Sequence, residues 1–238
     1  MAIKMESYQI MKKQWKKIVP VVLGGSFLCG PFAEAATELT DKIYTNNIDP
    51  ITGGSYSVSK GDVLLDASGY TGLPAYESSI INTMNGAVNI NINDGKTLTI
   101  KGYNNNPRPL NYHQGSALYA YQRGTLSGTM TFTGGNLIVS NEVTRTSHSS
   151  VFGLFADTGG KFDFKSDGDN KINLTVSVPM VGSMTADRHG IGLHNGERAF
   201  DGGNFLVKVD GDSVGSVNRR IGIEMAAGSN LDIKADNI

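Results

Sequence analysis

A loosely periodic repeat in the second half of the chain constrains its fold more than any other feature. Residues 152–170 align with residues 221–237, and residues 191–212 between them have the same internal order. Each copy contains an apolar-glycine-apolar triplet, a glycine-rich turn, an alternating strand and an aspartate-rich turn. An earlier copy, residues 117–141, places Ala120 where the others have glycine. Such self-similarity is typical of repeat architectures.

The alignment matches Gly153, Gly192 and Gly222, so the period is loose while the internal order is fixed. A stacked β coil produces this pattern, because each coil must turn apolar side chains inward while the bends absorb insertions. The alternative is an antiparallel sandwich with glycine-rich hairpins. Because the same turns recur in the same order, we expect the stacked coil.

Short segments in which apolar and polar residues alternate, bounded by Gly, Asn, Asp and Ser, place the chain in the all-β class. In residues 87–100, Val88, Ile90 and Ile92 alternate with asparagines, and Asp94 begins a turn. One face of such a strand is apolar and the other is polar. Residues 102–116 contain two prolines and interrupt the pattern, so we expect an exposed loop there.

The amino terminus has the order of a secretory signal peptide. A basic region precedes an apolar run, residues 18–32, that is shorter than the roughly 20 residues of a membrane-spanning helix. Ala33 and Ala35 are the small residues that a signal peptidase reads, which predicts cleavage after Ala35 and a mature chain starting at Ala36. The basic residues are Lys12, Lys13, Lys16 and Lys17.

Cleavage would remove Cys29, the single cysteine, so disulfides and thiolate metal sites are excluded from the mature chain. A lipoprotein signal has small residues directly before its cysteine, whereas Phe27 and Leu28 precede Cys29. We therefore expect no lipid anchor at Cys29. Translation could start at Met1 or Met11. Residues 1–35 contain five of the 21 basic and two of the 22 acidic residues, so the mature chain is acidic. An acidic chain without basic clusters does not fit a nucleic-acid partner.

Two histidines, His189 and His194, lie near Asp187 and could be drawn as a metal site. Their spacing fits neither a helical pair nor one strand face, so we expect solvated loop histidines and no metal. His113 and His148 are isolated in polar stretches.

Paired aspartates at Asp167 and Asp169, and at Asp210 and Asp212, could bind Ca²⁺ through oxygen ligands. They lack the closing glutamate of an EF-hand, so ordinary turns are expected. The segment with Asp210 and Asp212 also contains Ser213, in an interrupted form of the Gly-Asp-Ser-Gly motif of serine proteases. We interpret this segment as a turn and not as a nucleophile site. No cofactor is predicted.

The repeat has a specific resemblance, carried by Ile191-Gly192-Leu193, Gly202-Gly203-Asn204, Asp210-Gly211-Asp212, Ile221-Gly222-Ile223 and residues 230–232. Together with the signal peptide, these residues resemble the passenger regions of bacterial autotransporters, the type V secretion family. The resemblance covers roughly residues 80–238. It implies a right-handed parallel β-helix, export, and display at the surface of a Gram-negative cell.

The expected organisation is a signal peptide at residues 1–35, an amino-terminal cap or irregular β segment at 36–80, and passenger repeats at 81–238. The carboxy-terminal translocator barrel of the family is missing from this sequence, which ends within a repeat. We therefore expect the chain to be the amino-terminal piece of a longer protein.

The expected function is adhesive or structural binding rather than catalysis. The partner would be a protein or glycan on a host or neighbouring cell, and Tyr112, Tyr119 and Tyr121 are the candidate contact residues. One alternative is a polysaccharide-active enzyme, which needs carboxylates that converge on one face. We find no register among Asp157, Asp163, Asp187, Asp201 and Glu224. A second alternative is an ordinary periplasmic β domain.

Overall fold

The computed structural model describes residues 35–45, 49–70, 79–102, 116–142, 150–179, 187–210 and 219–238. From Ala36 onward these residues belong to one compact unit, Ala36–Ile238. Their secondary structure consists of strands and turns.

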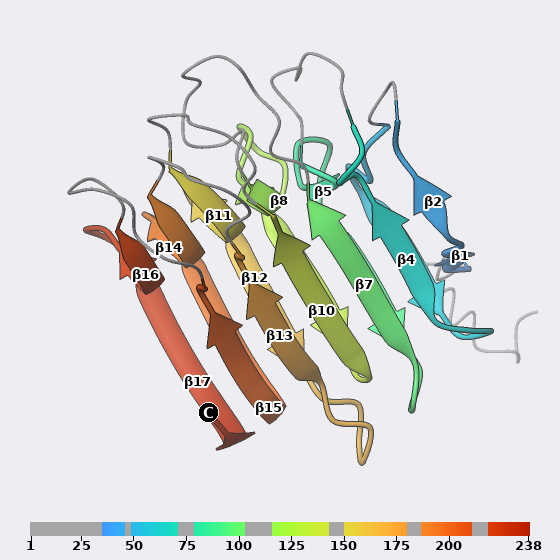
Figure 1. The fold of residues 1–238 in the computed structure, drawn as a ribbon. Coiled ribbons are helices and arrows are strands. Elements are labelled where there is room, and N and C mark those ends of the chain that lie inside the picture. Colours follow the sequence, from blue (N-terminus) through green and yellow to red (C-terminus); the bar gives the residue numbers. More distant parts are fainter. Residues whose placement is uncertain are drawn as a thin grey trace, which may run out of the picture. The chain divides into compact units, whose positions relative to one another are not determined.

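The strands form three sheets, which we name A, B and C, and the chain visits them repeatedly in that order (Figure 1). Sheet A contains β1 (Thr37–Glu38), β3 (Gly54–Val58), β6 (Val88–Ile92), β9 (Thr129–Thr133), β12 (Lys161–Lys165), the first part of β15 (Glu197–Lys208) and β17 (Asn230–Asn237). Sheet B contains β2 (Lys42–Ile43), β4 (Val63–Asp66), β7 (Thr97–Gly102), β10 (Asn136–Asn141), β13 (Asn173–Ser177) and the second part of β15. Sheet C contains β5 (Ile81–Asn82), β8 (Ser116–Tyr121), β11 (Val151–Asp157), β14 (Arg188–His194) and β16 (Arg220–Met225).

Neighbouring strands in all three sheets are parallel. Figure 1 shows β4, β7, β10 and β13 side by side, with their arrowheads at the same end. An antiparallel bridge between Asp167 and Asn170 closes a turn and joins no two strands. The predicted all-β parallel β-helix is therefore confirmed, and the antiparallel sandwich is excluded.

Alternating residues of each strand point into the space enclosed by the three sheets. In β6, Val88, Ile90 and Ile92 are buried while the asparagines between them are exposed, as the alternation predicted. Equivalent side chains of successive coils stack, for example Phe132 on Phe164 with ring centroids 5.5 Å apart and 11° between the planes. Each coil thus covers the apolar edge of the one before it, which is the main stabilising contribution in a solenoid.

The glycine register differs from the sequence alignment at one copy. Phe152 pairs with His189, and His189 pairs with Ile221, so Gly153 is equivalent to Gly190 and Gly222. The alignment had matched Gly192 instead, two residues too late. In the earlier copy Ser116 pairs with Phe152. Ala117, and not Ala120, therefore occupies the glycine position.

The structure explains why this position is glycine. A Cβ on Gly153 would lie 2.8 Å from the carbonyl oxygen of Gly190, and a Cβ on Gly190 would lie 2.7 Å from that of Gly222. Each would also collide with a core valine of sheet B. Gly222, in the last described coil, has open space around its Cα. The close approach of successive coils therefore requires the absent side chain.

An arginine occupies an inward position of the stack. Arg198 of β15 is 1% exposed, and its guanidinium carbon lies 4.5 Å from the centroid of the Phe205 ring. Among the described residues, none of its three guanidinium nitrogens has a hydrogen-bond partner. Burial lowers the pKa of Arg198 to about 9, because a low-dielectric site disfavours the charged form.

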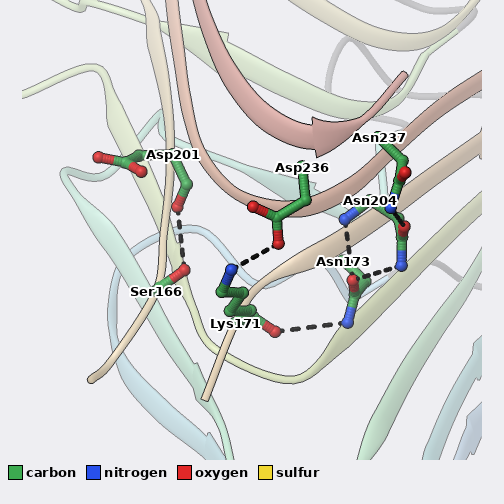
Figure 2. Close-up of polar contacts among 7 residues, drawn as sticks. All are labelled: Ser166, Lys171, Asn173, Asp201, Asn204, Asp236 and Asn237. Carbon is green, nitrogen blue, oxygen red and sulfur yellow. Dashed lines mark hydrogen bonds and ion pairs between the residues drawn. The ribbon is translucent and has the colours of Figure 1, made fainter. Parts of the chain in front are cut away.

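Four asparagines form a ladder at the corner between sheets A and B. Asn173 donates to Oδ1 of Asn136 at 3.1 Å, Asn204 to Oδ1 of Asn173 at 2.9 Å, and Asn237 to Oδ1 of Asn204 at 2.9 Å. Figure 2 shows the last three side chains in line, beside an ion pair between Lys171 and Asp236. The ladder satisfies polar groups where the chain turns from one sheet to the next.

Replacing an inner rung of this ladder should destabilise the stack. Asn173→Ala removes the donor to Asn136 and the acceptor for both the backbone and the side-chain amide of Asn204. We expect a loss of about 2 kcal/mol in the free energy of unfolding, measured by urea denaturation. Asn237→Ala is the control. It removes one donated bond at an exposed position and should cost less than about 0.5 kcal/mol. Equal losses for both variants would contradict this role.

The stack begins before the expected boundary at residue 81. β1 pairs with β3 and β3 with β6, while β2 pairs with β4 and β4 with β7. Residues from 37 onward therefore already belong to the coils, in the region where a cap or irregular β segment was expected.

The connections differ strongly in length between the three corners. At the corner between sheets C and A, and at the corner between A and B, short turns such as 158–160 and 134–135 join the strands. Each gap between the described ranges falls instead between a strand of sheet B and the following residues of sheet C. The predicted loop at 102–116 is one of these B–C connections, and most of it lies outside the described residues.

Candidate functional site

Several residues singled out from the sequence meet on the outer face of sheet C. Parallel pairing places Tyr119 beside Phe155, Tyr121 beside Asp157, and Asp157 beside His194. The residues between them on β8 and β11, Ala120 and Ala156, belong to the core. Because side chains alternate along a strand, these five residues occupy the opposite, outer side.

Aromatic rings cover much of this face. The ring of Tyr119 stacks on Tyr121 at 5.9 Å and on Phe155 at 6.0 Å, and Phe152 packs against Phe155 at 4.6 Å. Tyr119 is only 6% exposed, whereas Tyr121 is half-buried. Burial, followed by the charge of Asp157, raises the pKa of Tyr119. Of the three tyrosines expected at a contact surface, Tyr119 and Tyr121 share one face and Tyr112 lies outside the described residues.

Gly192 allows these rings to pack against β14. A Cβ at this position would overlap the ring of Phe152 and would lie 2.8 Å from the ring of Phe155. The glycine that the alignment had matched with Gly153 is therefore an outer-face residue with a different role.

His189 and His194 approach one carboxylate from the neighbouring coil. Oε2 of Glu224 on β16 lies 3.0 Å from Nδ1 of His189 and 3.5 Å from Nε2 of His194. His189 is 1% exposed and stacks on Phe152 at 4.5 Å. The expectation of solvated loop histidines was wrong. Gly190 and Ile191 both face inward, which interrupts the alternation of β14, so residues 189 and 194 lie on the same face despite their odd spacing.

Burial and the neighbouring carboxylates act in opposite directions on the pKa of His189. Burial lowers the pKa of His189 and outweighs the attraction of Glu224 and Asp187 for its charged form. Burial also acts to raise the pKa of Asp187, but hydrogen bonds and charge from Arg219 hold it below its usual value. Arg219 binds Asp187 through its backbone N–H and its guanidinium at 2.7–2.8 Å. Asp187 therefore fixes the start of β16 rather than joining the histidine cluster.

This arrangement makes stability depend on pH. Because the folded pKa of His189 lies below the value in the unfolded chain, the unfolded chain binds a proton more readily. Stability is then complete above about pH 6.5 and falls as the pH drops below it. We expect the thermal midpoint to fall between about pH 7 and 5, and His189→Phe to remove most of that fall. A drop of the same size in the variant would contradict the assignment.

The remaining acidic residues lie apart from this face. Asp163 and Asp201 belong to sheet A, and Asp163 lies 3.9 Å from Lys165. Asp210 pairs with Lys208 at 2.9 Å. Asp167 and Asp169 occupy the turn between β12 and β13, while Asp212 and Ser213 lie outside the described residues. In the part of the chain that the structure describes, no group of three or more His, Cys, Asp or Glu is arranged to hold a metal ion.

A shallow depression near the first coils has a structural explanation. It is lined by residues 38–41 and 60–63. The carboxylate of Glu38 accepts hydrogen bonds from the hydroxyls of Ser57 and Ser59 and from the N–H groups of Ser59 and Lys60. These bonds, led by that of the Ser59 side chain, lower the pKa of Glu38 to about 2. The carboxylate thus holds the turn between β3 and β4.

Comparison of the chain with models of protein families, with curated proteins and with solved structures found no match.

The predicted signal cleavage site lies at the edge of the described residues. Ala35 and Ala36 are exposed directly before β1, and Ala33 lies outside the described residues. Across the described ranges, no helix combines the length and the apolar character needed to cross a membrane.

Sequence reasoning missed the contact between Glu224 and the two histidines. The missing information was the register. Once Gly190 rather than Gly192 is matched to Gly153, His189 falls beside Phe152 and Glu224 falls beside Gly192. The histidines then lie one coil from the carboxylate.

Proposed function

We propose that this chain is an exported, surface-displayed β-helix that binds a partner through one corner of its stack, in the manner of an autotransporter passenger. The observation that carries the proposal is the unequal distribution of connections. The connections longer than seven residues, which differ from coil to coil, all join sheet B to sheet C, while those at the other two corners have at most seven residues. In solenoid proteins, insertions concentrated on one face often mark the binding face.

The composition of these B–C connections suits a polar partner that is not a nucleic acid. They are rich in Asn, Ser, Thr, Gly and Tyr, which is the composition of adaptable binding loops. Between the strands that they join, these connections contain three basic residues, Arg108, Arg145 and Arg219, and six acidic residues, Asp49, Glu77, Glu142, Asp187, Asp210 and Asp212. A corner with a net negative charge fits a glycan or a polar protein surface better than a nucleic acid. The partner in this proposal is a glycan or protein on a host or neighbouring cell.

The location is part of the same proposal. The signal peptide at residues 1–35 would direct export, and a translocator barrel encoded with the passenger would anchor the stack at the outer membrane of a Gram-negative cell. The rigid coils would then hold the B–C corner away from the membrane.

Binding to an array of neutral and acidic glycans and to intact cells tests the proposal. A variant in which residues 103–115 are replaced by a Gly/Ser segment of equal length should lose at least about tenfold in affinity, with an unchanged thermal midpoint. The matched control is Lys165→Ser on the outer face of sheet A, which should bind normally. Binding that survives replacement of every B–C connection would contradict the proposal.

A second candidate is a hydrolytic enzyme on the same scaffold. Asp157 and Glu224 share the outer face of sheet C, and His194 lies between their strands, beside Asp157 and 3.5 Å from Glu224. Two carboxylates on one face could serve as acid and base towards a glycosidic bond. If polysaccharide cleavage is measured and is abolished by Glu224→Gln and by Asp157→Asn, this second function replaces the first.

A further inference from the structure

The last described coil leaves one face of the stack unpaired. Among the described strands, β16 pairs only with β14, and β17 pairs only with β15. We call the free edges of these two strands, with the inward side chains of Ile223, Leu231 and Ile233, the end face. Its backbone N–H and C=O groups point along the stack axis, where an additional parallel strand would bind.

The inward side chains of the end face are only partly covered. Leu231 and Ile233 are half-buried, although they are in register with Phe162 and Phe164, which are fully buried two coils earlier. Ile223 is likewise half-buried, whereas Ile191 beside it is fully buried. Arg198 at the Leu231 position of the preceding coil is also buried, so the exposure of Leu231, Ile233 and Ile223 comes from the missing neighbour and not from their residue type.

Two further residues of the end face, Gly222 and Asn237, match residues that make contacts between coils elsewhere in the stack. Gly222 keeps the side-chain-free bend that Gly153 and Gly190 need for close approach, yet nothing lies within 4 Å of where its Cβ would be. Asn237 donates to Asn204, but among the described residues no donor reaches its own Oδ1. Each inner rung of the ladder has such a donor from the next coil.

We infer that the end face is a docking surface for one further coil of parallel β-helix. Its strand over β17 would place apolar side chains opposite Leu231 and Ile233, and an asparagine opposite Asn237. Continuity with the established interfaces between coils carries this inference, since the register of the preceding coils fixes all three positions. The inference depends on the stack alone and is independent of the proposed binding function.

The first coil of a second copy does not fit this surface. β1 and β2 have two residues each, whereas β17 has eight. Glu38 of β1 already holds the turn after β3. The occupant is therefore a further coil of parallel β-helix with full-length strands, and self-association of the chain is an outcome of the test.

The experiment extends the full chain by one coil in the observed register. Because Asn237 is in register with Asn204, a second copy of residues 205–237 is joined directly after Asn237. In the matched control the appended copy carries Leu231→Asp and Ile233→Asp, so that the same length of chain cannot cover the apolar positions. Hydrogen exchange of the original β17 amides and the effect of Gly222→Ala are measured in each protein, with circular dichroism as the check of folding.

If the inference is correct, β17 amides exchange at least about tenfold more slowly in the extended protein and not in the control. Gly222→Ala, neutral in the chain itself, then shifts the unfolding equilibrium of the extended protein at least about tenfold towards the unfolded state. Unchanged exchange and a neutral Gly222→Ala in the extended protein would overturn the inference. It would also be overturned if the unextended chain formed a dimer that Ile233→Asp dissociates, because the surface would then belong to a second copy.

Discussion

Gly190→Ala should lower the free energy of unfolding by about 3 kcal/mol, close to the upper end of the usual cost of overpacking. The added methyl group would lie 2.7 Å from the carbonyl oxygen of Gly222 and would also collide with Val207 in the core. Neither neighbour can move easily, since the first is backbone of the next coil and the second is held between sheets. Chemical denaturation of the purified variant measures the loss directly.

Gly222→Ala is the matched control for this substitution. Both glycines occupy the same position of the repeat, but no atom lies within 4 Å of the added methyl group at Gly222. We expect a change of less than about 0.5 kcal/mol. If the two substitutions had equal effects, the cost would come from intrinsic backbone preference and not from contact between coils.

Arg198→Met should stabilise the chain, by about 2 kcal/mol at neutral pH. The guanidinium is buried without a hydrogen-bond partner among the described residues, and it lies over the Phe205 ring. Replacement of a buried charge by an apolar side chain of similar volume often stabilises a protein. Lys161→Met, at a partly exposed position on the neighbouring strand β12, is the control and should be close to neutral.

The gain from Arg198→Met should shrink as the pH rises. The folded pKa of Arg198, about 9, lies below the ordinary value of 12.5. The unfolded chain therefore holds this proton more tightly, and the wild type gains stability between those two values as the folded guanidinium loses its charge. A difference between the wild type and the variant that stays constant from about pH 8 to about pH 10.5 would contradict this account.

The repeat and the alternation of residues were enough to predict the stacked coils. The inward positions of β6 follow directly from the sequence, since every second residue is Val or Ile. The exact register did not follow. His189-Gly190-Ile191 and Ile191-Gly192-Leu193 both offer glycine between two other residues, and only the paired strands show that the first is the equivalent triplet.

The outer face of sheet C could not be predicted for a related reason. Residues 189 and 194 share a face because Gly190 and Ile191 both face inward, whereas strict alternation would separate them. The burial of Arg198 also had no signal in the sequence, because an arginine at an inward position has the same local pattern as one in a loop. Long-range contacts between coils decide both features.

The most direct test of the stacked coils is a pair of engineered cysteines, Ile138→Cys and Thr175→Cys, in a Cys29→Ser background. These positions are direct neighbours on β10 and β13, so their Cα atoms should lie about 5 Å apart, within the range of a disulfide. We expect this pair to form an intramolecular disulfide in the folded protein, whereas Ile138→Cys with Ser177→Cys should stay reduced. Rapid cross-linking of the second pair with none in the first would contradict the parallel register on which the account depends.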